Sequence, residues 1–187
     1  SITKLNTLLE KEYMFDLTDF NKTKSTIIKE KPDFIFHLAA QPIVSISLDD
    51  PILNWNSNLM GSLSVLESIK KLKKKISVVM VTSDKCYHNN EWIWGYKESD
   101  KLGGDDPYSA SKAATEIMIN SQIKSFFSSN SNNKFISSAR AGNVIGGGDW
   151  AKNRIVPDCI RSIIKNNKIK IRNPNSTRPW QHVLEPL

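Results

Sequence analysis

Five polar side chains lie in two short clusters near the middle of the sequence. Ser83, Asp84 and Lys85 follow directly on the apolar run VVMVT, and three residues separate Tyr108 from Lys112. Residues four apart share one face of a helix, so Tyr108 and Lys112 are expected to point the same way. An ammonium group beside a phenol favours the phenolate and lowers a pKa that is ordinarily about 10. The grouping therefore predicts a site that removes and returns protons.

A strand and a helix are needed to bring these side chains together. Residues 76–82 form an apolar, β-branched run typical of a buried strand, which would place Ser83 at the strand end. Asp106 can cap the next helix with Pro107 in its first turn, and the helix is expected to reach about Phe127. The first turn of that helix would then lie near the end of the strand.

The rest of the chain alternates between expected strands and helices. Parallel strands need long crossover connections, so this alternation predicts an α/β fold with a doubly wound, Rossmann-type parallel sheet. Ligands of such sheets bind at the carboxyl ends of the strands. Residues 128–133 read as a polar turn and 142–149 as a glycine-rich loop. The expected strands are 12–17 (ending at Asp16), 33–38 (a buried strand), 134–141 and 169–172, and the expected helices are 19–30, 51–74 and 154–166.

Composition and charge exclude several classes of protein. The chain is 39% hydrophobic and 24% charged, no apolar run approaches ~20 residues, and the first residues lack a signal-peptide layout. We therefore expect a cytoplasmic protein without a membrane span. Cys86 and Cys159 lie far apart without metal-type spacing, so neither a disulfide nor a metal site is expected. The net charge of +7 raises nucleic acid as a partner, but five lysines within 70–75 lie where cations oppose the helix dipole, and nucleic acid is not expected.

The ordered motifs resemble the extended short-chain dehydrogenase/reductases, a family of NAD-dependent epimerases and dehydratases. The resemblance rests on HLAA at 37–40, Asn58 within NLMG, Ser83, and the Tyr108-x-x-x-Lys112 pair. The stretches DPYSASK, GNVIGGGDWA and RPWQHVLEP are similar to the branch of nucleotide-sugar 4,6-dehydratases that acts on CDP-glucose. The resemblance implies NAD as cofactor and a nucleotide-diphosphate sugar, CDP-glucose foremost, as substrate.

The same resemblance assigns the five polar side chains steps in removing water from a hexose. Tyr108 would take the C4 hydroxyl proton during oxidation, with Lys112 lowering the phenol pKa and Ser83 hydrogen-bonding the reacting oxygen. Asp84 would protonate the departing C6 hydroxyl. Lys85 stands where the dTDP-glucose branch has a glutamate base, and it would act either as the C5 base or as a partner that orients Asp84.

Further residues are assigned to the cofactor and the substrate by resemblance. Asp16 and Leu17 match a pair that contacts the adenine ring, and Arg178 matches a residue that pairs with the substrate diphosphate. A polar residue tolerated in a long helix explains Asn58 equally well, and several of the basic positions are as well explained by a surface location. The expected cofactor-binding residues are Asp16, Leu17, Leu38, Ala39, Ala40, Gln41, Asn58, Thr82, Tyr108 and Lys112, and the expected substrate-binding residues are Asn143, Arg154, Arg172, Arg178 and His182.

One motif of the family is absent. Members hold the cofactor pyrophosphate on a G-x-x-G-x-x-G turn after the first strand, whereas the first glycine here is Gly61. In the family's strand order 3-2-1-4-5-6, residues 12–17 would be strand 3 and 33–38 strand 4, with strands 1 and 2 missing between them. We expect the chain to be an internal part of a longer enzyme, and the 187 residues alone to fold poorly, bind NAD weakly and be inactive.

The resemblance also implies a domain organisation and an assembly. Residues 1–150 would form part of an NAD-binding domain, and 151–187 the beginning of a nucleotide-sugar-binding region. The intact enzyme is expected to be a homodimer through helices 51–74 and 106–127.

Two other functions remain open. A 4-epimerase uses the same serine, tyrosine and lysine. Its reaction includes no dehydration, so it does not need Asp84 and Lys85 as an acid and a base. A pseudoenzyme that binds ligand without catalysis would keep the fold, although the intact Ser83, Asp84, Tyr108 and Lys112 argue against it.

Overall fold

The computed structural model describes residues 8–128 and 133–187. Contacts divide the chain into two compact units, one formed by Tyr13–Ala141 and a second that contains Gly142–Leu187. The expected boundary at residue 150 stays a prediction. Among the described residues, no helix is both long enough and apolar enough to cross a bilayer.

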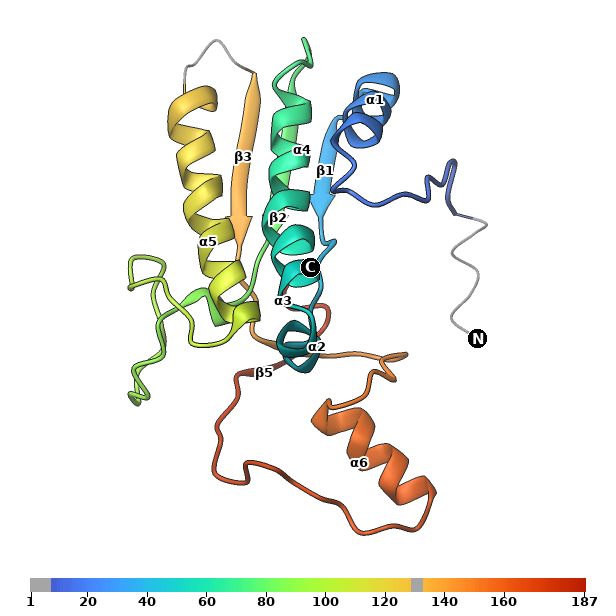
Figure 1. The fold of residues 1–187 in the computed structure, drawn as a ribbon, viewed down its shortest axis with the longest axis vertical. Helices are drawn as coiled ribbons and strands as arrows, with labels where there is room; N and C mark the ends of the chain where they lie inside the picture. The colour runs from blue at the N-terminus through green and yellow to red at the C-terminus, as the bar shows by residue number, and fades with distance from the viewer. Residues whose placement is uncertain (1–7, 129–132) are drawn as a thin grey trace. The chain divides into compact units, whose positions relative to one another are not determined.

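Three parallel strands form the sheet of the larger unit (Figure 1). They are β1 (Phe34–His37), β2 (Ile76–Val81) and β3 (Lys134–Ala139), in the order β1-β2-β3. The strands pair in register, with Val79 opposite Phe36 on one side and opposite Ser137 on the other. Because parallel neighbours cannot be joined by a tight turn, each connection crosses over through helices, which confirms the predicted parallel α/β fold.

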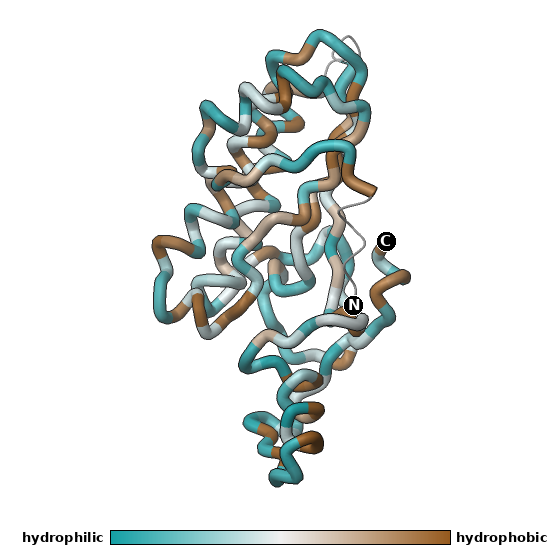
Figure 2. The backbone as a smooth tube through the Cα atoms, turned by 90° about the vertical axis from the view of Figure 1, so that its right-hand side faces the viewer, coloured by the Kyte–Doolittle hydropathy of each residue, from teal (hydrophilic) through white to brown (hydrophobic). Residues whose placement is uncertain are grey.

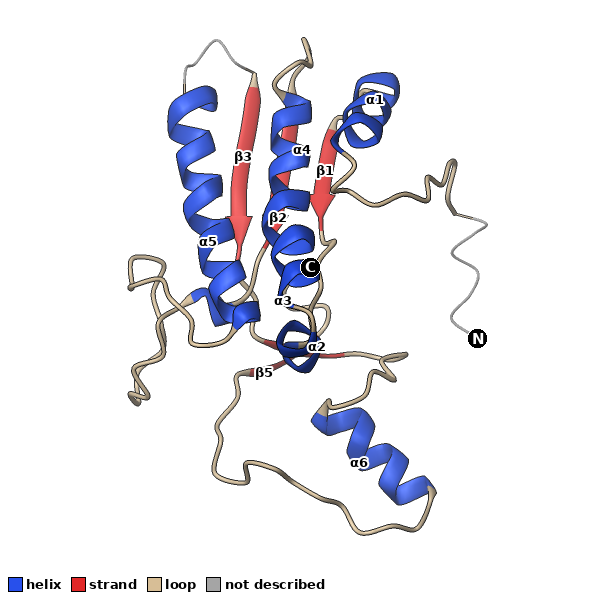
Figure 3. Ribbon diagram, viewed as in Figure 1, coloured by secondary structure: helices blue, strands red, loops and turns tan. Residues whose placement is uncertain are grey.

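Helices and strands alternate along this unit (Figure 3). The first helix lies within the predicted range 19–30, and Asp19 caps it by accepting a hydrogen bond from the Lys22 amide. The helices are α1 (Phe20–Glu30), α2 (Val44–Asp49), α3 (Pro51–Trp55), the π-helix η2 (Asn56–Met60), α4 (Gly61–Ile69), α5 (Pro107–Gln122) and the π-helix η4 (Ile123–Phe127).

The helix predicted over residues 51–74 is shorter than expected. It starts at Pro51, capped by Asp50, but it ends at Ile69, so the run of lysines lies beyond the helix. Like charges three and four residues apart repel one another on a helix, which disfavours continuation through that run. The short helix α2 was not predicted.

The hydrophobic core lies between the sheet and the helices on one of its faces. Ile76, Val78 and Met80 of β2 are buried against Leu66 and Ile69 of α4, and partly buried residues of α1, β1 and β3 pack around them. Side chains of a strand alternate between faces, so Ser77, Val79 and Val81 point the other way. Figure 2 shows hydrophobic residues recurring among hydrophilic ones along the helices, as one-sided packing requires.

The opposite face of the sheet is apolar and exposed. Phe34 and Phe36 of β1 are 66% and 65% exposed, and Phe135 of β3 is 57% exposed. The prediction that residues 33–38 form a buried strand is therefore wrong for Phe34 and Phe36, although Ile35 and His37 do point into the core side. Within the described residues, the helices of the unit pack on the side of Ile35 and His37.

The strand predicted over residues 12–17 is not formed. Asp16 instead closes a turn, in which its carboxylate accepts hydrogen bonds from the amide and hydroxyl of Thr18, each at 2.8 Å. A strand is stabilised by hydrogen bonds to a neighbouring strand, and this segment pairs with none in the described residues. Most of the polar turn predicted at 128–133 lies outside the described residues.

The second unit contains one helix and one pair of strands. Helix α6 (Ile155–Ile164) follows Arg154 as predicted. Strand β4 (Asn143–Ile145) pairs in parallel with β5 (Trp180–His182), so the expected loop at 142–149 begins with a strand. The strand expected at 169–172 is absent. At Gly142 an added Cβ would lie 2.7 Å from Pro179, so a larger residue there would push the two segments apart.

Candidate active site

The carboxyl end of β2 holds the first cluster of predicted site residues. Ser83 caps the 3₁₀ turn η3 (Asp84–Cys86): its hydroxyl accepts a hydrogen bond from the Lys85 amide at 3.2 Å and donates one to Asp84 Oδ1 at 3.1 Å. The Asp84 amide donates to the carbonyl of Ala141 at 3.0 Å. The turn is thus fixed to the end of the neighbouring strand, with Ser83 buried and Asp84 and Lys85 half-buried.

Helix α5 presents the second cluster in its first two turns. Asp106 caps the helix by accepting hydrogen bonds from the Ser109 amide at 3.0 Å and hydroxyl at 2.6 Å, and Pro107 stands in the first turn, as predicted. Tyr108 and Lys112 are both buried, and the Lys112 ammonium lies 6.0 Å from the centroid of the Tyr108 ring. The shared face predicted from their spacing is confirmed.

A close approach of backbone holds the start of α5 beside the loop that precedes it. A Cβ built on Gly104 would lie 2.5 Å from the Ala110 nitrogen and 2.6 Å from Ser109 Cβ. Only glycine allows the chain to pass so near to the first helical turn. Helix α5 also packs against η3, so the two clusters belong to adjoining elements.

Lys112 is a cation in a position that disfavours charge. Burial lowers its pKa to about 8, while the nearby Cys86 and Glu116 oppose the shift. Burial, with a contribution from Lys112, also lowers the pKa of His37 to about 4, so that imidazole is neutral at pH 7. His37 Nε2 lies 2.9 Å from the Ser62 hydroxyl. Lys112 therefore remains the protonated group beside Tyr108 at neutral pH.

Asn58 lies at the centre of a buried hydrogen-bond network. Its Oδ1 accepts from the Gln41 amide at 2.8 Å, and its Nδ2 donates to Asn54 Oδ1 at 3.0 Å and Ser111 Oγ at 2.9 Å. It sits in η2, and π-turns are frequent at functional sites. Asn58 thus ties the segment after β1 to α5, and its assignment to the cofactor stays a prediction.

Several predicted cofactor residues line one hollow at the end of β1. Leu17, Leu38 and Ala39 border a space of about 300 Å³ together with His37 and Phe15. Asp16 is exposed, Ala40 is half-buried, and Gln41 is buried. An apolar hollow beside a carboxylate suits the adenosine part of a dinucleotide, whereas a glycine-rich turn for its pyrophosphate is missing from the sequence.

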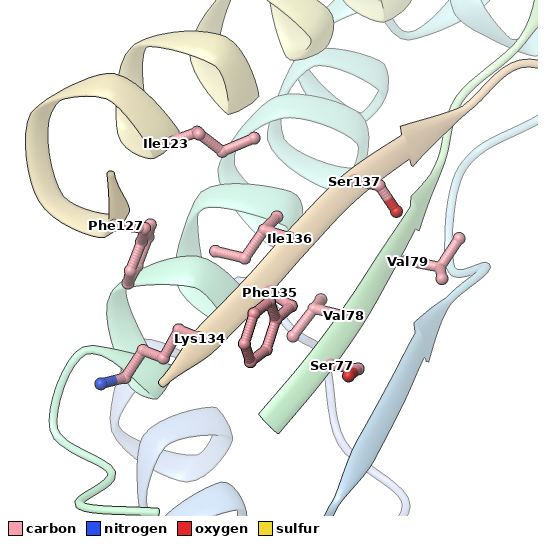
Figure 4. Close-up of a pocket in the computed structure, with 9 residues that line it drawn as sticks. All are labelled: Ser77, Val78, Val79, Ile123, Phe127, Lys134, Phe135, Ile136 and Ser137. Carbon is pink, nitrogen blue, oxygen red and sulfur yellow. The ribbon is translucent and has the colours of Figure 1, made fainter. Parts of the chain in front are cut away.

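A second hollow, of about 460 Å³, lies away from these residues (Figure 4). It is lined by residues of β2, β3 and η4, among them Phe135, Ile136 and Phe127. None of the predicted site residues borders it, and its lining is mostly apolar without a cluster of ionisable groups. The ends of β1 and β2, where the predicted site residues lie, therefore remain the candidate active site.

The sequence reasoning missed two charged residues in the site. Glu116 on α5 is buried, and its carboxylate forms an ion pair of 2.8 Å with Arg140, which follows β3. The sequence feature that could have identified Glu116 is its spacing, because it lies four residues after Lys112 and eight after Tyr108 and so shares their helix face. Thr82 donates its hydroxyl proton to Glu116, and its predicted contact with the cofactor stays a prediction.

The predicted substrate residues lie in the second unit, where they do not form one cluster. Asn143 and His182 lie on the paired strands β4 and β5. Arg154 forms a 3.7 Å ion pair with Asp149, Arg172 donates to the Asn153 carbonyl at 2.8 Å, and Arg178 donates to the Thr177 carbonyl at 3.3 Å. Their contact with a substrate stays a prediction.

A parallel α/β sheet with a serine after one strand and a Tyr-x-x-x-Lys pair on the following helix defines the class of the extended short-chain dehydrogenase/reductases. A profile of the GDP-mannose 4,6-dehydratase family matches residues 5–186, and the chain belongs to that family. The predicted family resemblance is confirmed.

Individual relatives agree with this assignment. The chain is 48% identical over 189 residues to CDP-glucose 4,6-dehydratase of Salmonella typhimurium, covering 100% of this chain and 52% of the relative. It is 28% identical over 184 residues to dTDP-D-glucose 4,6-dehydratase of Dictyostelium discoideum, covering 92% of this chain and 41% of the relative. The chain thus spans about half the length of the curated relatives it matches.

Solved structures share the fold. UDP-glucose 4-epimerase from Thermotoga maritima superposes with a TM-score of 0.80 at 21% identity, over 92% of this chain and 55% of the epimerase. A dTDP-glucose 4,6-dehydratase from Streptomyces venezuelae, determined with NAD bound, gives a TM-score of 0.77 at 19% identity, over 90% of this chain and 49% of that enzyme. Both comparisons confirm the Rossmann-type fold.

Proposed function

We propose that this chain carries the catalytic residues of an NAD-dependent nucleotide-sugar 4,6-dehydratase, and that CDP-glucose is the substrate. The observation that carries the proposal is the placement of Ser83, Asp84 and Lys85 on a turn that packs against the helix bearing Tyr108 and Lys112. A dehydratase needs an acid and a base beyond the Ser-Tyr-Lys set, and this turn supplies both. The 48% identity to the Salmonella enzyme supports CDP-glucose over other nucleotide sugars.

The first chemical task is oxidation at C4, since it makes the C5 hydrogen acidic by placing it next to a ketone. NAD supplies a reversible hydride acceptor for this purpose. Tyr108 takes the proton of the C4 hydroxyl, Lys112 favours the phenolate through its positive charge, and Ser83 hydrogen-bonds the reacting oxygen. Leu17, Leu38 and Ala39 would hold the adenosine end of the cofactor.

The second task is elimination of water across C5 and C6. Asp84 protonates the departing C6 hydroxyl, and Lys85 removes the C5 proton. In the described structure Asp84 accepts a hydrogen bond from the Ser83 hydroxyl at 3.1 Å, and this orientation by Ser83 favours Lys85 as the base over the alternative in which Lys85 orients Asp84. The reduced cofactor would supply the hydride that C6 takes up, and Lys85 would return its proton to C5, which gives a 4-keto-6-deoxy sugar.

The substrate test uses the chain within a full-length enzyme. The 187 residues replace the matching 189 residues of the Salmonella dehydratase, and the chimera is incubated with CDP-glucose or UDP-glucose. We expect absorbance at 320 nm in alkali, the signature of a 4-keto-6-deoxy sugar, with CDP-glucose and not with UDP-glucose, and none for Tyr108→Phe. Epimerised product without this absorbance would replace the dehydratase with a 4-epimerase, and NAD binding without either product would leave a binding module.

The role of Lys85 has its own test. In the chimera, Lys85→Ala should lose exchange of the C5 hydrogen with solvent while C4 oxidation of bound sugar persists. Exchange near the unmutated rate would show that Lys85 is not the base.

We also propose that the intact enzyme dimerises through α3–α4 and α5. Ile52 on α3, Met60 in η2 and Ile117 on α5 are 75%, 45% and 59% exposed, which is unusual for apolar side chains on three packed helices. Ile52→Lys with Ile117→Lys should halve the mass of the chimera in light scattering. An unchanged dimer mass would place the interface elsewhere.

A further inference from the structure

Glu116 is a buried carboxylate that touches three elements around the site. It lies on α5 with 5% exposure, and it accepts hydrogen bonds from Thr82 at the end of β2 and from Ser138 of β3, the latter at 3.0 Å. Arg140 supplies the third contact, an ion pair of 2.8 Å. One carboxylate therefore joins the Tyr-x-x-x-Lys helix to the ends of two strands.

Arg140 extends these contacts to the loop that follows the 3₁₀ turn. Its guanidinium donates to the Tyr87 hydroxyl at 3.0 Å and to the Glu98 carbonyl at 3.2 Å, and it lies 4.9 Å from the centroid of the Tyr87 ring. The planar, five-donor guanidinium makes such simultaneous contacts where a lysine would not. The Glu116–Arg140 pair thus contacts Thr82 and Tyr87, which lie on either side of the three residues Ser83–Lys85, and Glu116 itself lies on the helix of Tyr108 and Lys112.

The surroundings of the pair favour its ionised form despite its burial. Burial acts to raise the pKa of Glu116, but hydrogen bonds from Arg140, Thr82 and Ser138 outweigh it and hold the pKa below its usual value. Hydrogen bonding to Glu116 raises the pKa of Arg140. Removing charges from water is costly, so buried pairs contribute little net stability and are better explained by the geometry that they impose.

We propose that Glu116 and Arg140 are positioning residues. They fix the position of α5 along its own axis relative to the end of β2, and thereby place Tyr108 and Lys112 relative to Ser83. Glu116 lies on the same helix face as Tyr108 and Lys112, and its partner Thr82 directly precedes Ser83. The contact between Thr82 and Glu116 therefore links the reacting phenol and the serine through a short, buried path. A helix advances ~1.5 Å per residue, and a misplacement of ~1 Å at a reaction centre can cost ~100-fold in rate.

The test measures turnover and binding separately, and it rests on the proposed function. In the chimera, Glu116→Gln keeps one acceptor oxygen, for either Thr82 or Ser138, and removes the charge that holds Arg140. We expect kcat with CDP-glucose to fall about 10- to 100-fold, with KM and the NAD Kd within about twofold, because the binding surfaces are retained. Arg140→Lys, which cannot keep both Tyr87 and Glu116 in reach, should give the same pattern and serves if Glu116→Gln fails to fold.

Two matched controls separate positioning from loss of stability. Glu67→Gln breaks a carboxylate–ammonium contact with Lys70 on α4, away from the site, and should leave kcat unchanged. Ile119→Val removes one methylene group from the buried face of α5 and should lower the melting temperature without a matching loss of kcat. If Glu116→Gln reduces kcat no more than Ile119→Val at equal loss of melting temperature, the positioning role is excluded.

Amide hydrogen exchange gives a readout that does not depend on the substrate. Glu116→Gln should speed exchange in residues 107–112 relative to Glu67→Gln, because the first turns of α5 lose their anchor. Faster exchange in a chimera that produces no keto sugar would contradict the dehydratase proposal but support the positioning proposal. Unchanged exchange together with unchanged kcat would overturn the positioning proposal.

Discussion

Lys112 shows at the scale of a single residue how catalysis and stability compete. Its ammonium is buried and its pKa falls to about 8, so the folded protein carries a cation at neutral pH in a place that disfavours it. A positive charge is nevertheless what the proposed phenolate of Tyr108 requires. Active sites commonly hold groups whose removal would stabilise the fold.

Lys112→Met should therefore stabilise the chimera and abolish turnover. The lysine pKa is about 8 when folded and 10.5 in its ordinary state, so below pH 8 the charged residue destabilises the fold by up to about 3 kcal/mol. Between pH 8 and 10.5 the unfolded chain binds more protons, so wild-type stability rises with pH. Denaturation at pH 7 and pH 10 should show the advantage of methionine shrinking, while Lys73→Met, at an exposed site, changes little. A constant advantage would contradict the depressed pKa.

Asn58 is a second residue whose substitution separates two roles. Asn58→Ala leaves the buried Gln41 amide without its acceptor, and an unsatisfied buried group costs about 1–3 kcal/mol. Ser111 loses the donor from Asn58 but still donates its hydroxyl to the Tyr108 carbonyl. We expect a lower melting temperature with NAD affinity changed less than threefold, measured by calorimetry. A large loss of NAD affinity at unchanged melting temperature would favour direct contact with the cofactor.

At the scale of elements, the site depends on how closely a loop approaches the start of α5. Gly104 permits this close approach, since a Cβ added there would lie 2.5 Å from backbone atoms of Ser109 and Ala110. The helix start itself is local, made by Asp106 and Pro107. The loop thus sets where the capped helix begins relative to η3.

Gly104→Ala should displace the first turn of α5. The added methyl group would lie at 2.5–2.6 Å from backbone and Cβ atoms that cannot rotate away, so Tyr108 must shift with the helix. We expect a fall in kcat of about 10- to 100-fold and a lower melting temperature. Gly95→Ala is the matched control, because nothing lies within 4 Å of its added methyl group. Equal effects of the two substitutions would argue against a steric cause.

At the scale of the whole molecule, the described helices of the larger unit cover one face of the three-stranded sheet. Phe34, Phe36 and Phe135 form an apolar surface on the other face, within the part of the chain that the structure describes. Exposed apolar sheet faces of this kind favour association and bind hydrophobic dyes. Parallel sheets are ordinarily covered on both faces.

The 187-residue chain on its own should therefore bind the dye ANS, associate in solution, and bind NAD weakly. Phe34→Ser with Phe36→Ser should reduce dye binding, since these two rings supply much of the exposed surface. Dye fluorescence, light scattering and calorimetry with NAD measure the three properties. Tight NAD binding by the isolated chain would show that the missing glycine-rich turn is dispensable.

Local features of the sequence predicted well where Tyr108 and Lys112 lie on their helix. The cap at Asp106, the proline after it and the four-residue spacing of Tyr108 and Lys112 act within two helical turns, so no distant contact is needed to form them. The apolar run of β2 was equally clear, because a strand buried on one face and half-buried on the other is apolar nearly throughout.

What the sequence determined by itself was the family, the parallel α/β class, and the helix face that presents a phenol and an amine. Only the tertiary structure decided which apolar segments became strands. Among the described residues, 12–17 and 169–172 pair with no strand, whereas β4 pairs with β5 across more than thirty residues of chain. It also decided that Glu116 is held by Thr82, Ser138 and Arg140. Strand pairing and buried ion pairs join residues distant in sequence, so local pattern cannot specify them.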